Sequence, residues 1–121
     1  MRTVNSRSGV YLALSLRVAE TLGSKLIGLL GRTDLPAGEG LWIKRCNAVH
    51  TFGMNFPIDV LFLDRNGQVV GVSRALRPNR ISNIYPGARS VIELPVDTVE
   101  ATGTRIGDRV EVVDGSPDKT P

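Results

Sequence analysis

The chain has 121 residues and a net charge of +3, and 41% of its residues are hydrophobic and 22% charged. These values are typical of one globular domain, so we expect a single domain over residues 1–121, with an ordered core at about 9–114 and flexible ends. No apolar run approaches the ~20 residues of a membrane span, and the N-terminus has no secretory signal pattern. We therefore expect a cytoplasmic protein without a membrane partner. The single cysteine excludes a disulfide within the chain.

The first half of the chain is predicted to contain two strands and the main helix. Residues 1–8 have no pattern and are predicted to be a loose tail. Apolar residues alternate from Val10 to Val18, which predicts one half-buried strand. An amphipathic helix is then predicted between Thr21, as N-cap, and Gly31, from a leucine stripe at Leu22, Leu26, Leu29 and Leu30. Residues 41–44 are predicted to be a short strand.

The second half is predicted to be rich in strands. Residues 45–57 form a loop, because Gly53 and Pro57 interrupt any ladder. The apolar run Ile58 to Leu63 predicts a buried strand, and the following Asp-Arg-Asn-Gly at 64–67 predicts a hairpin turn. Further elements are predicted as strands at 68–73, 88–94 and 109–113 and a short helical segment at 97–103. Because these elements do not alternate as strand–helix–strand, we predict an α+β fold: a mostly antiparallel, strongly curved or barrel-like β-sheet with one main helix packed on it.

Cys46, His50 and Met54 follow one another at intervals of four residues, which puts them on one side of either a helix or a strand. One interpretation is a copper site, because thiolate, imidazole and thioether are soft-metal ligands, but a blue-copper site needs a second histidine that the chain lacks. A second is nucleophilic catalysis, with Cys46 as thiolate and His50 as base, but no cysteine-hydrolase signature surrounds Cys46. The third is structural, with the sulfur side chains filling a core. We favour the third and predict no catalytic residue, no metal and no cofactor, while leaving open whether the protein is an enzyme.

Asp59 interrupts an otherwise apolar strand, and a buried carboxylate needs partners. Either it pairs with an arginine, or it pins the preceding loop by accepting hydrogen bonds from groups such as Thr51 and Asn55, or it is a pocket acid. We favour the pinning acid. The candidate pocket residues are Cys46, His50, Thr51, Met54 and Asp59.

A basic segment runs from Arg65 to Ile92, with five arginines and no acidic residue. If these arginines converge, they form an anion-binding face, for which Arg74, Arg77 and Arg80 are the candidates. A solvated surface is the commoner explanation of such a segment. Aromatic residues make up only 5% of the chain, which disfavours a nucleic-acid partner held by base stacking.

The sequence also lacks the motifs of several enzyme classes. It has no P-loop, no dinucleotide-binding GxGxxG after a strand, no HExxH, no CxxC and no GxSxG. These absences remove the usual support for nucleotide hydrolysis, dinucleotide binding, zinc proteolysis and serine hydrolysis.

Five motifs are spread along the chain: Gly28-Leu29-Leu30-Gly31-Arg32, Glu39-Gly40-Leu41, the run from Val49 to Asp64, Val91-Ile92-Glu93-Leu94 and Ile106-Gly107-Asp108. In their order and spacing they resemble the motifs of the DUF192 family of small bacterial and archaeal proteins. The chain resembles a C-x-x-x-H-T-F-x-M branch of the family, with His50 where the commoner form has Trp and Met54 where it has Thr. The resemblance implies a compact β-rich fold with a packed helix, and it implies no activity.

The leading hypothesis from the sequence is a non-enzymatic binding module with a small pocket near residues 45–59. Its ligand would be a small molecule or a peptide. The alternatives are a Cys46/His50-dependent enzyme and nucleic-acid or anion binding through the 65–89 segment. We expect a monomer or a weak dimer.

Overall fold

The computed structural model describes residues 1–19 and 34–114. The main helix expected at 21–31 and the tail after Asp114 lie outside the described residues. The elements in chain order are β1 (Arg2–Asn5), β2 (Tyr11–Ala13), β3 (Ser15–Ala19), β4 (Glu39–Lys44), β5 (Ile58–Leu63), β6 (Val69–Leu76), β7 (Ser90–Pro95), α2 (Thr98–Thr102) and β8 (Val110–Val113).

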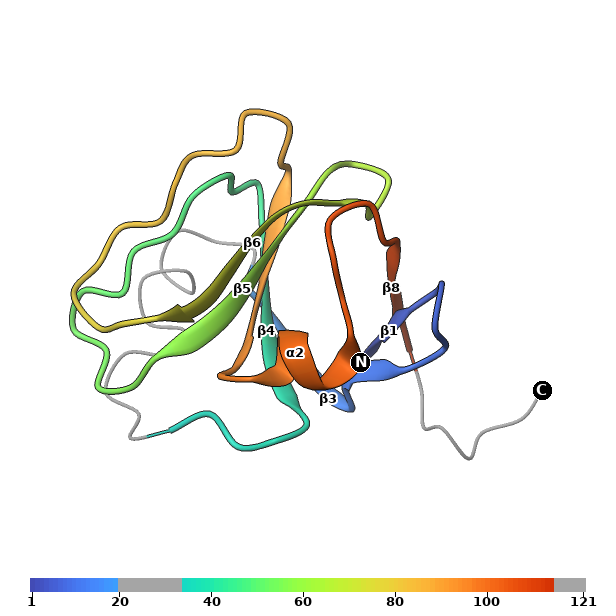
Figure 1. Ribbon diagram of the computed structural model, residues 1–121, viewed down its shortest axis with the longest axis horizontal. Helices are drawn as coiled ribbons and strands as arrows, with labels where there is room; N and C mark the ends of the chain where they lie inside the picture. Colours follow the sequence, from blue (N-terminus) through green and yellow to red (C-terminus); the bar gives the residue numbers. More distant parts are fainter. Residues whose placement is uncertain (20–33, 115–121) are drawn as a thin grey trace.

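The strands form two sheets, which lie beside each other with α2 between them in the view of Figure 1. The larger sheet has the order β3-β4-β7-β5-β6, and the smaller one has the order β2-β1-β8. All pairs are antiparallel except β3 with β4. The mostly antiparallel β-rich fold is therefore confirmed. The barrel-like arrangement is not confirmed, because the described strands form two separate sheets that are not closed.

The hairpin of β5 and β6 was predicted from the sequence and is confirmed. Every residue of β5 is buried, in agreement with its apolar run. At the turn, Asp64 Oδ1 accepts hydrogen bonds from the backbone N–H groups of Asn66 (2.8 Å) and Gln68 (2.9 Å). Gly67 has φ +80°, a conformation that favours glycine. The strand β6 continues to Leu76, three residues beyond the predicted end.

The N-terminal region differs from the prediction in two ways. Residues 2–5 form the middle strand of the smaller sheet rather than a tail. The predicted single strand at 10–18 is two strands, β2 and β3, which belong to different sheets. The change occurs at Leu14, where the N–H groups of Leu14 and Ser15 both donate to the carbonyl of Gly38. Leu14 is 56% exposed, although its place in the alternating pattern predicted burial.

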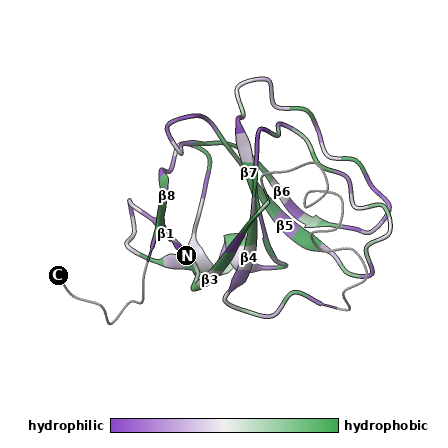
Figure 2. Cartoon of the chain, turned by 180° about the vertical axis from the view of Figure 1, so that it is seen from behind, coloured by the Kyte–Doolittle hydropathy of each residue, from purple (hydrophilic) through white to green (hydrophobic). Residues whose placement is uncertain are grey.

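The core has two parts, which lie on opposite faces of the larger sheet because alternate residues of β5 belong to each. Hydropathy colouring shows apolar residues along these strands (Figure 2). One part contains Ile58, Val60 and Phe62 of β5; the other contains Leu61 and Leu63 and packs against the smaller sheet and α2. None of the described helices is long and apolar enough to span a membrane.

A carboxylate at Asp108 joins the N-terminal strands to the turn before β8. It accepts hydrogen bonds from Arg7 Nε (2.7 Å), Asn5 Nδ2 (2.9 Å) and the Arg105 N–H (3.0 Å). The hydrogen bond from the Arg7 guanidinium, helped by that of Asn5, holds the pKa of Asp108 well below its ordinary value. Residues that are more than 95 positions apart are thus held together by one buried acid.

Candidate functional site

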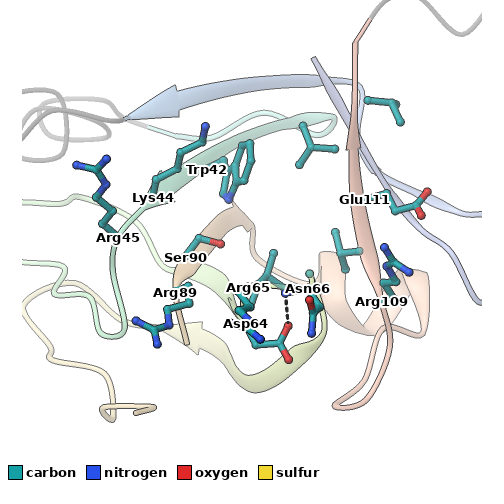
Figure 3. A pocket seen from close by; sticks show the side chains of 15 residues that line it. Trp42, Lys44, Arg45, Asp64, Arg65, Asn66, Arg89, Ser90, Arg109 and Glu111 are labelled. Atoms are coloured by element: carbon teal, nitrogen blue, oxygen red, sulfur yellow. Dashed lines mark hydrogen bonds between the residues drawn. The ribbon is translucent and has the colours of Figure 1, made fainter. Parts of the chain in front are cut away.

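A pocket of about 530 Å³ opens where one end of the larger sheet meets β8 (Figure 3), and we call it the Trp42 pocket. Its lining comes from four segments: the end of β4, the β5–β6 turn, the start of β7, and β8 with the residue before it. The lining residues are Trp42, Lys44, Arg45, Leu63, Asp64, Arg65, Asn66, Gly67, Arg89, Ser90, Arg109, Val110, Glu111, Val112 and Val113. The pocket is therefore assembled from residues that are far apart in the sequence.

The β5–β6 turn is held against β8 by backbone contacts. The Val110 N–H donates to the Gly67 carbonyl at 2.8 Å, and the Val69 N–H donates to the Asp108 carbonyl at 2.8 Å. A Cβ at Gly67 would lie 2.6 Å from the Val110 carbonyl oxygen, so this close approach requires glycine. The local sequence of the turn therefore fixes one wall of the pocket.

The charges around the pocket are mainly positive. Five cationic side chains line it, against two carboxylates, and one of those, Asp64, is used by the turn. Within residues 1–19 and 34–114, the guanidinium groups of Arg65, Arg89 and Arg109 make no ion pair and no hydrogen bond. The cationic residues are Lys44, Arg45, Arg65, Arg89 and Arg109.

Trp42 lines the pocket next to one of its cations. The Lys44 Nζ lies 4.6 Å from the centroid of its ring, a cation–π contact. The indole Nε1 is shielded from solvent and has no hydrogen-bond partner. Figure 3 shows this nitrogen on the edge of the ring toward Ser90.

A second cavity of about 490 Å³ lies beside Cys46 and is lined by residues 45–48, 88 and 89. It shares Arg45 and Arg89 with the Trp42 pocket. The Cys46 Sγ donates to the carbonyl of Ala48 at 2.8 Å. Of the five candidate pocket residues, Cys46 is the one that lines a described cavity.

His50, Thr51 and Met54 lie on a loop that crosses the residues after β6. His50 is exposed; its ring stacks on Phe52 (5.0 Å between centroids), and its Nδ1 accepts from the Phe52 N–H. Thr51 is fully buried, and its hydroxyl donates to the Arg77 carbonyl and accepts from the Arg80 N–H. Met54 is buried in the core part that contains Phe62. No described hydrogen bond joins Cys46 to His50, so the geometry adds no support for a thiolate–imidazole pair.

Asp59 is 1% exposed and lies apart from these residues. Its Oδ1 accepts from the Ala75 N–H and its Oδ2 from the Val99 N–H, both at 2.9 Å. It therefore holds an irregular point of β6 and the first turn of α2 rather than the preceding loop. Because Asp59 alternates with Ile58 and Val60 along β5, its side chain lies on the face opposite Met54.

The candidate anion-binding residues Arg74, Arg77 and Arg80 are exposed and line neither of the two cavities. The basic segment of the sequence is thus divided: Arg65 and Arg89, at its ends, reach the Trp42 pocket, and the middle three do not.

Four residues that line the pocket were not predicted from the sequence as site residues: Trp42, Lys44, Arg45 and Arg109. The one signal for the first three was the Trp-Ile-Lys-Arg run at 42–45, which places an aromatic next to two cations. Arg109 becomes relevant only through the fold.

Among the described residues, no group of three or more His, Cys, Asp or Glu side chains is placed to hold a metal ion.

The family of the chain follows from its similarity to known proteins. The profile of DUF192, described as "Uncharacterized ACR", matches residues 3–112. The chain belongs to the DUF192 family. It is 41% identical to a UPF0127 protein of Thermococcus sibiricus over 112 residues, which cover 89% of the chain and 72% of that protein.

Two further similarities agree with this assignment. A UPF0127 protein of Pyrococcus furiosus is 30% identical to this DUF192 chain, with 89% of the chain and 95% of that protein covered. The crystal structure of a protein of unknown function from Novosphingobium aromaticivorans has a TM-score of 0.81, with 22% identity and coverage of 92% of this chain and 83% of that one. The latter similarity concerns the fold alone. No specific function is shown for the family.

Proposed function

We propose that this DUF192 protein is a non-enzymatic binding module that takes a small anionic ligand into the Trp42 pocket. The observation that supports this best is the meeting of five cationic side chains, from four segments, at one cavity of about 530 Å³. Charges of one sign around a concave surface raise the local potential and attract a ligand of the opposite sign. A cavity of this volume is within the range that holds small molecules.

The three guanidinium groups without described partners are suited to this role. Arg65 lies in the β5–β6 turn, Arg89 just before β7 and Arg109 just before β8, so that three different segments bring them to the lining of the pocket (Figure 3). Guanidinium groups bind carboxylate and phosphate oxygens with two parallel hydrogen bonds. A bound anion would supply acceptors for these groups and reduce the repulsion between them.

The test is a calorimetric titration of the protein with phosphate and with citrate at low ionic strength. Two double variants are compared, Arg65→Gln/Arg89→Gln at the pocket and Arg74→Gln/Arg77→Gln away from it. Both remove two positive charges from exposed arginines, so long-range electrostatic effects are matched. A hydrogen bond to a charged group contributes about 1.5–3 kcal/mol, so the pocket double variant should bind at least about tenfold more weakly.

The control double variant should bind within about twofold of the unmodified protein, and binding should weaken as salt is added. Equal losses in the two double variants would contradict the proposal, because they would reflect net charge alone. Loss in the control variant only would instead favour Arg74 and Arg77 as the anion-binding residues. The proposal would also be overturned if neither these anions nor organic carboxylates and phosphates bind.

A further inference from the structure

The positive charge of the pocket does not account for one of its features, the indole N–H of Trp42. Its nitrogen is buried without a hydrogen-bond partner, and such groups are uncommon in folded proteins. An unsatisfied buried donor loses its hydration without compensation. Any acceptor that reaches this nitrogen therefore gains a hydrogen bond at a position where the unliganded protein has none.

The surroundings of the indole combine charge with apolar surface. Lys44 covers the ring at 4.6 Å, and Arg65 and Arg89 line the same cavity. Apolar side chains line part of the cavity as well, namely Leu63 of β5 and the β8 residues Val110, Val112 and Val113, beside Glu111 of the same strand. Inorganic ions would bind to the cations and leave these apolar side chains without contacts.

We propose that the ligand is an organic anion with a carboxylate or phosphate group on an apolar body, and that one anionic oxygen accepts a hydrogen bond from Trp42 Nε1. The inference rests on the function proposed above. The charged oxygens lie among the arginines, and the apolar body packs on the valines of β8. Because the nitrogen is shielded from solvent, lining side chains must move before a ligand oxygen can reach it, and rotamer changes of exposed side chains are fast. Trp42 is then the residue that selects an oxygen acceptor.

The chain contains a single tryptophan, so its indole N–H gives one cross-peak in a ¹H–¹⁵N NMR spectrum. We would titrate the full chain with benzoate, phenyl phosphate, inorganic phosphate and the uncharged analogue benzamide. The inference expects benzoate or phenyl phosphate to shift the indole cross-peak downfield with saturation, with at least tenfold tighter binding than inorganic phosphate. Benzamide should bind at least tenfold more weakly than benzoate.

Trp42→Phe, which keeps an aromatic ring but removes the donor, should weaken binding of the favoured probe about tenfold. Because that variant also alters packing, the titration of the unmodified protein is decisive. If anions bind with dependence on Arg65 and Arg89 but the indole cross-peak does not move, this inference is wrong and the proposed function stands. The same holds if inorganic phosphate binds as tightly as phenyl phosphate. If none of the anions binds, both are wrong.

Discussion

Replacing Glu93 by glutamine is expected to stabilise the protein at neutral pH and to have little effect in acid. Glu93 lies on β7, the middle strand of the larger sheet, opposite Leu41 of β4 and Val60 of β5. It is 5% exposed, and no described residue makes a hydrogen bond or ion pair with its carboxyl group. Arg17, opposite Leu41 on β3, is the cation in the same row across the sheet, two strand spacings or about 10 Å away.

The size and sign of the effect follow from the pKa. Burial raises the pKa of Glu93 from 4.5 to about 7, so the folded protein holds this proton more tightly than the unfolded chain. The contribution of Glu93 to stability is therefore most favourable below pH 4.5, becomes less favourable as the pH rises from 4.5 to about 7, and changes no further above that. At 1.36 kcal/mol per pH unit the loss is about 3 kcal/mol, a large part of the 5–15 kcal/mol that is typical of a folded domain.

The assay is urea unfolding at pH 4.5, 5.5, 6.5 and 7.5. Glutamine resembles the protonated acid, so the difference in unfolding free energy between Glu93→Gln and the unmodified protein should rise from near zero at pH 4.5 to about 3 kcal/mol at pH 7.5. Glu111→Gln, which changes an exposed carboxylate on β8, is the control and should show no such rise. A difference that stays constant with pH would refute the reasoning, because it would mean that the Glu93 carboxyl is solvated or paired in the folded protein.

Three further changes test contacts that hold the fold together away from the pocket. Asp59→Asn should cost about 2 kcal/mol of unfolding free energy, because an amide cannot accept from both the Ala75 and the Val99 N–H; a variant with unchanged urea midpoint would contradict the hydrogen bonds assigned to Asp59. Asp108→Asn should cost about 2 kcal/mol at pH 7 and progressively less as the pH falls below 3.8, since the lowered pKa of Asp108 makes its contribution fully present above about 3.8 and lost as the pH falls toward the folded-state pKa; an equal cost at pH 7 and at pH 2 would argue against the pairing with Arg7. Gly71→Ala should cost about 1–3 kcal/mol because its Cβ would overlap the Tyr85 ring, and adding Tyr85→Ser should remove that overlap; if thermal melting shows no loss for Gly71→Ala, the close approach is absent in solution.

The elements that the sequence predicted well are those whose pattern is local. The strand β5 was predicted with its observed ends, because five apolar residues and Asp59 lie between a proline and a turn sequence. The hairpin turn followed from Asp64 and Gly67, whose roles depend on neighbours within four residues. The short helix α2 lies within the predicted 97–103 segment and ends at Gly103 with φ +67°.

The N-terminal strands were predicted less well because their pairing is non-local. The alternation from Val10 to Val18 fits one strand, yet the chain passes from one sheet to the other at Leu14, where the Gly38 carbonyl accepts from two successive N–H groups. Likewise, β1 lacks an apolar pattern, since it is held by pairing with β2 and β8 and by the Asp108 network. Pairing with a strand about 100 residues away cannot be predicted from the local sequence pattern.

For Asp59, the sequence predicted that the carboxylate needs hydrogen-bond partners but not which residues supply them. A carboxylate in an apolar strand had to have partners, and the structure gives it two backbone donors. The expected donors were in the loop just before the strand. The observed ones, Ala75 and Val99, come from β6 and α2 instead. One of them, Ala75, has φ +50°, so the acid stabilises a strained point of β6 that the sequence did not indicate.

The positive pocket could not have been found from the basic segment alone. That segment puts five arginines within 25 positions, but β6 carries the chain away from the turn at Arg65, and the chain returns to the same end of the sheet only at Arg89. The remaining cations come from the end of β4, which lies beside β7, and from Arg109, which is bridged to Gln68 across the turn. Strand order, rather than closeness in sequence, decides which charges meet. For this reason the comparison of Arg65/Arg89 with Arg74/Arg77 separates an assembled site from a merely basic stretch of chain.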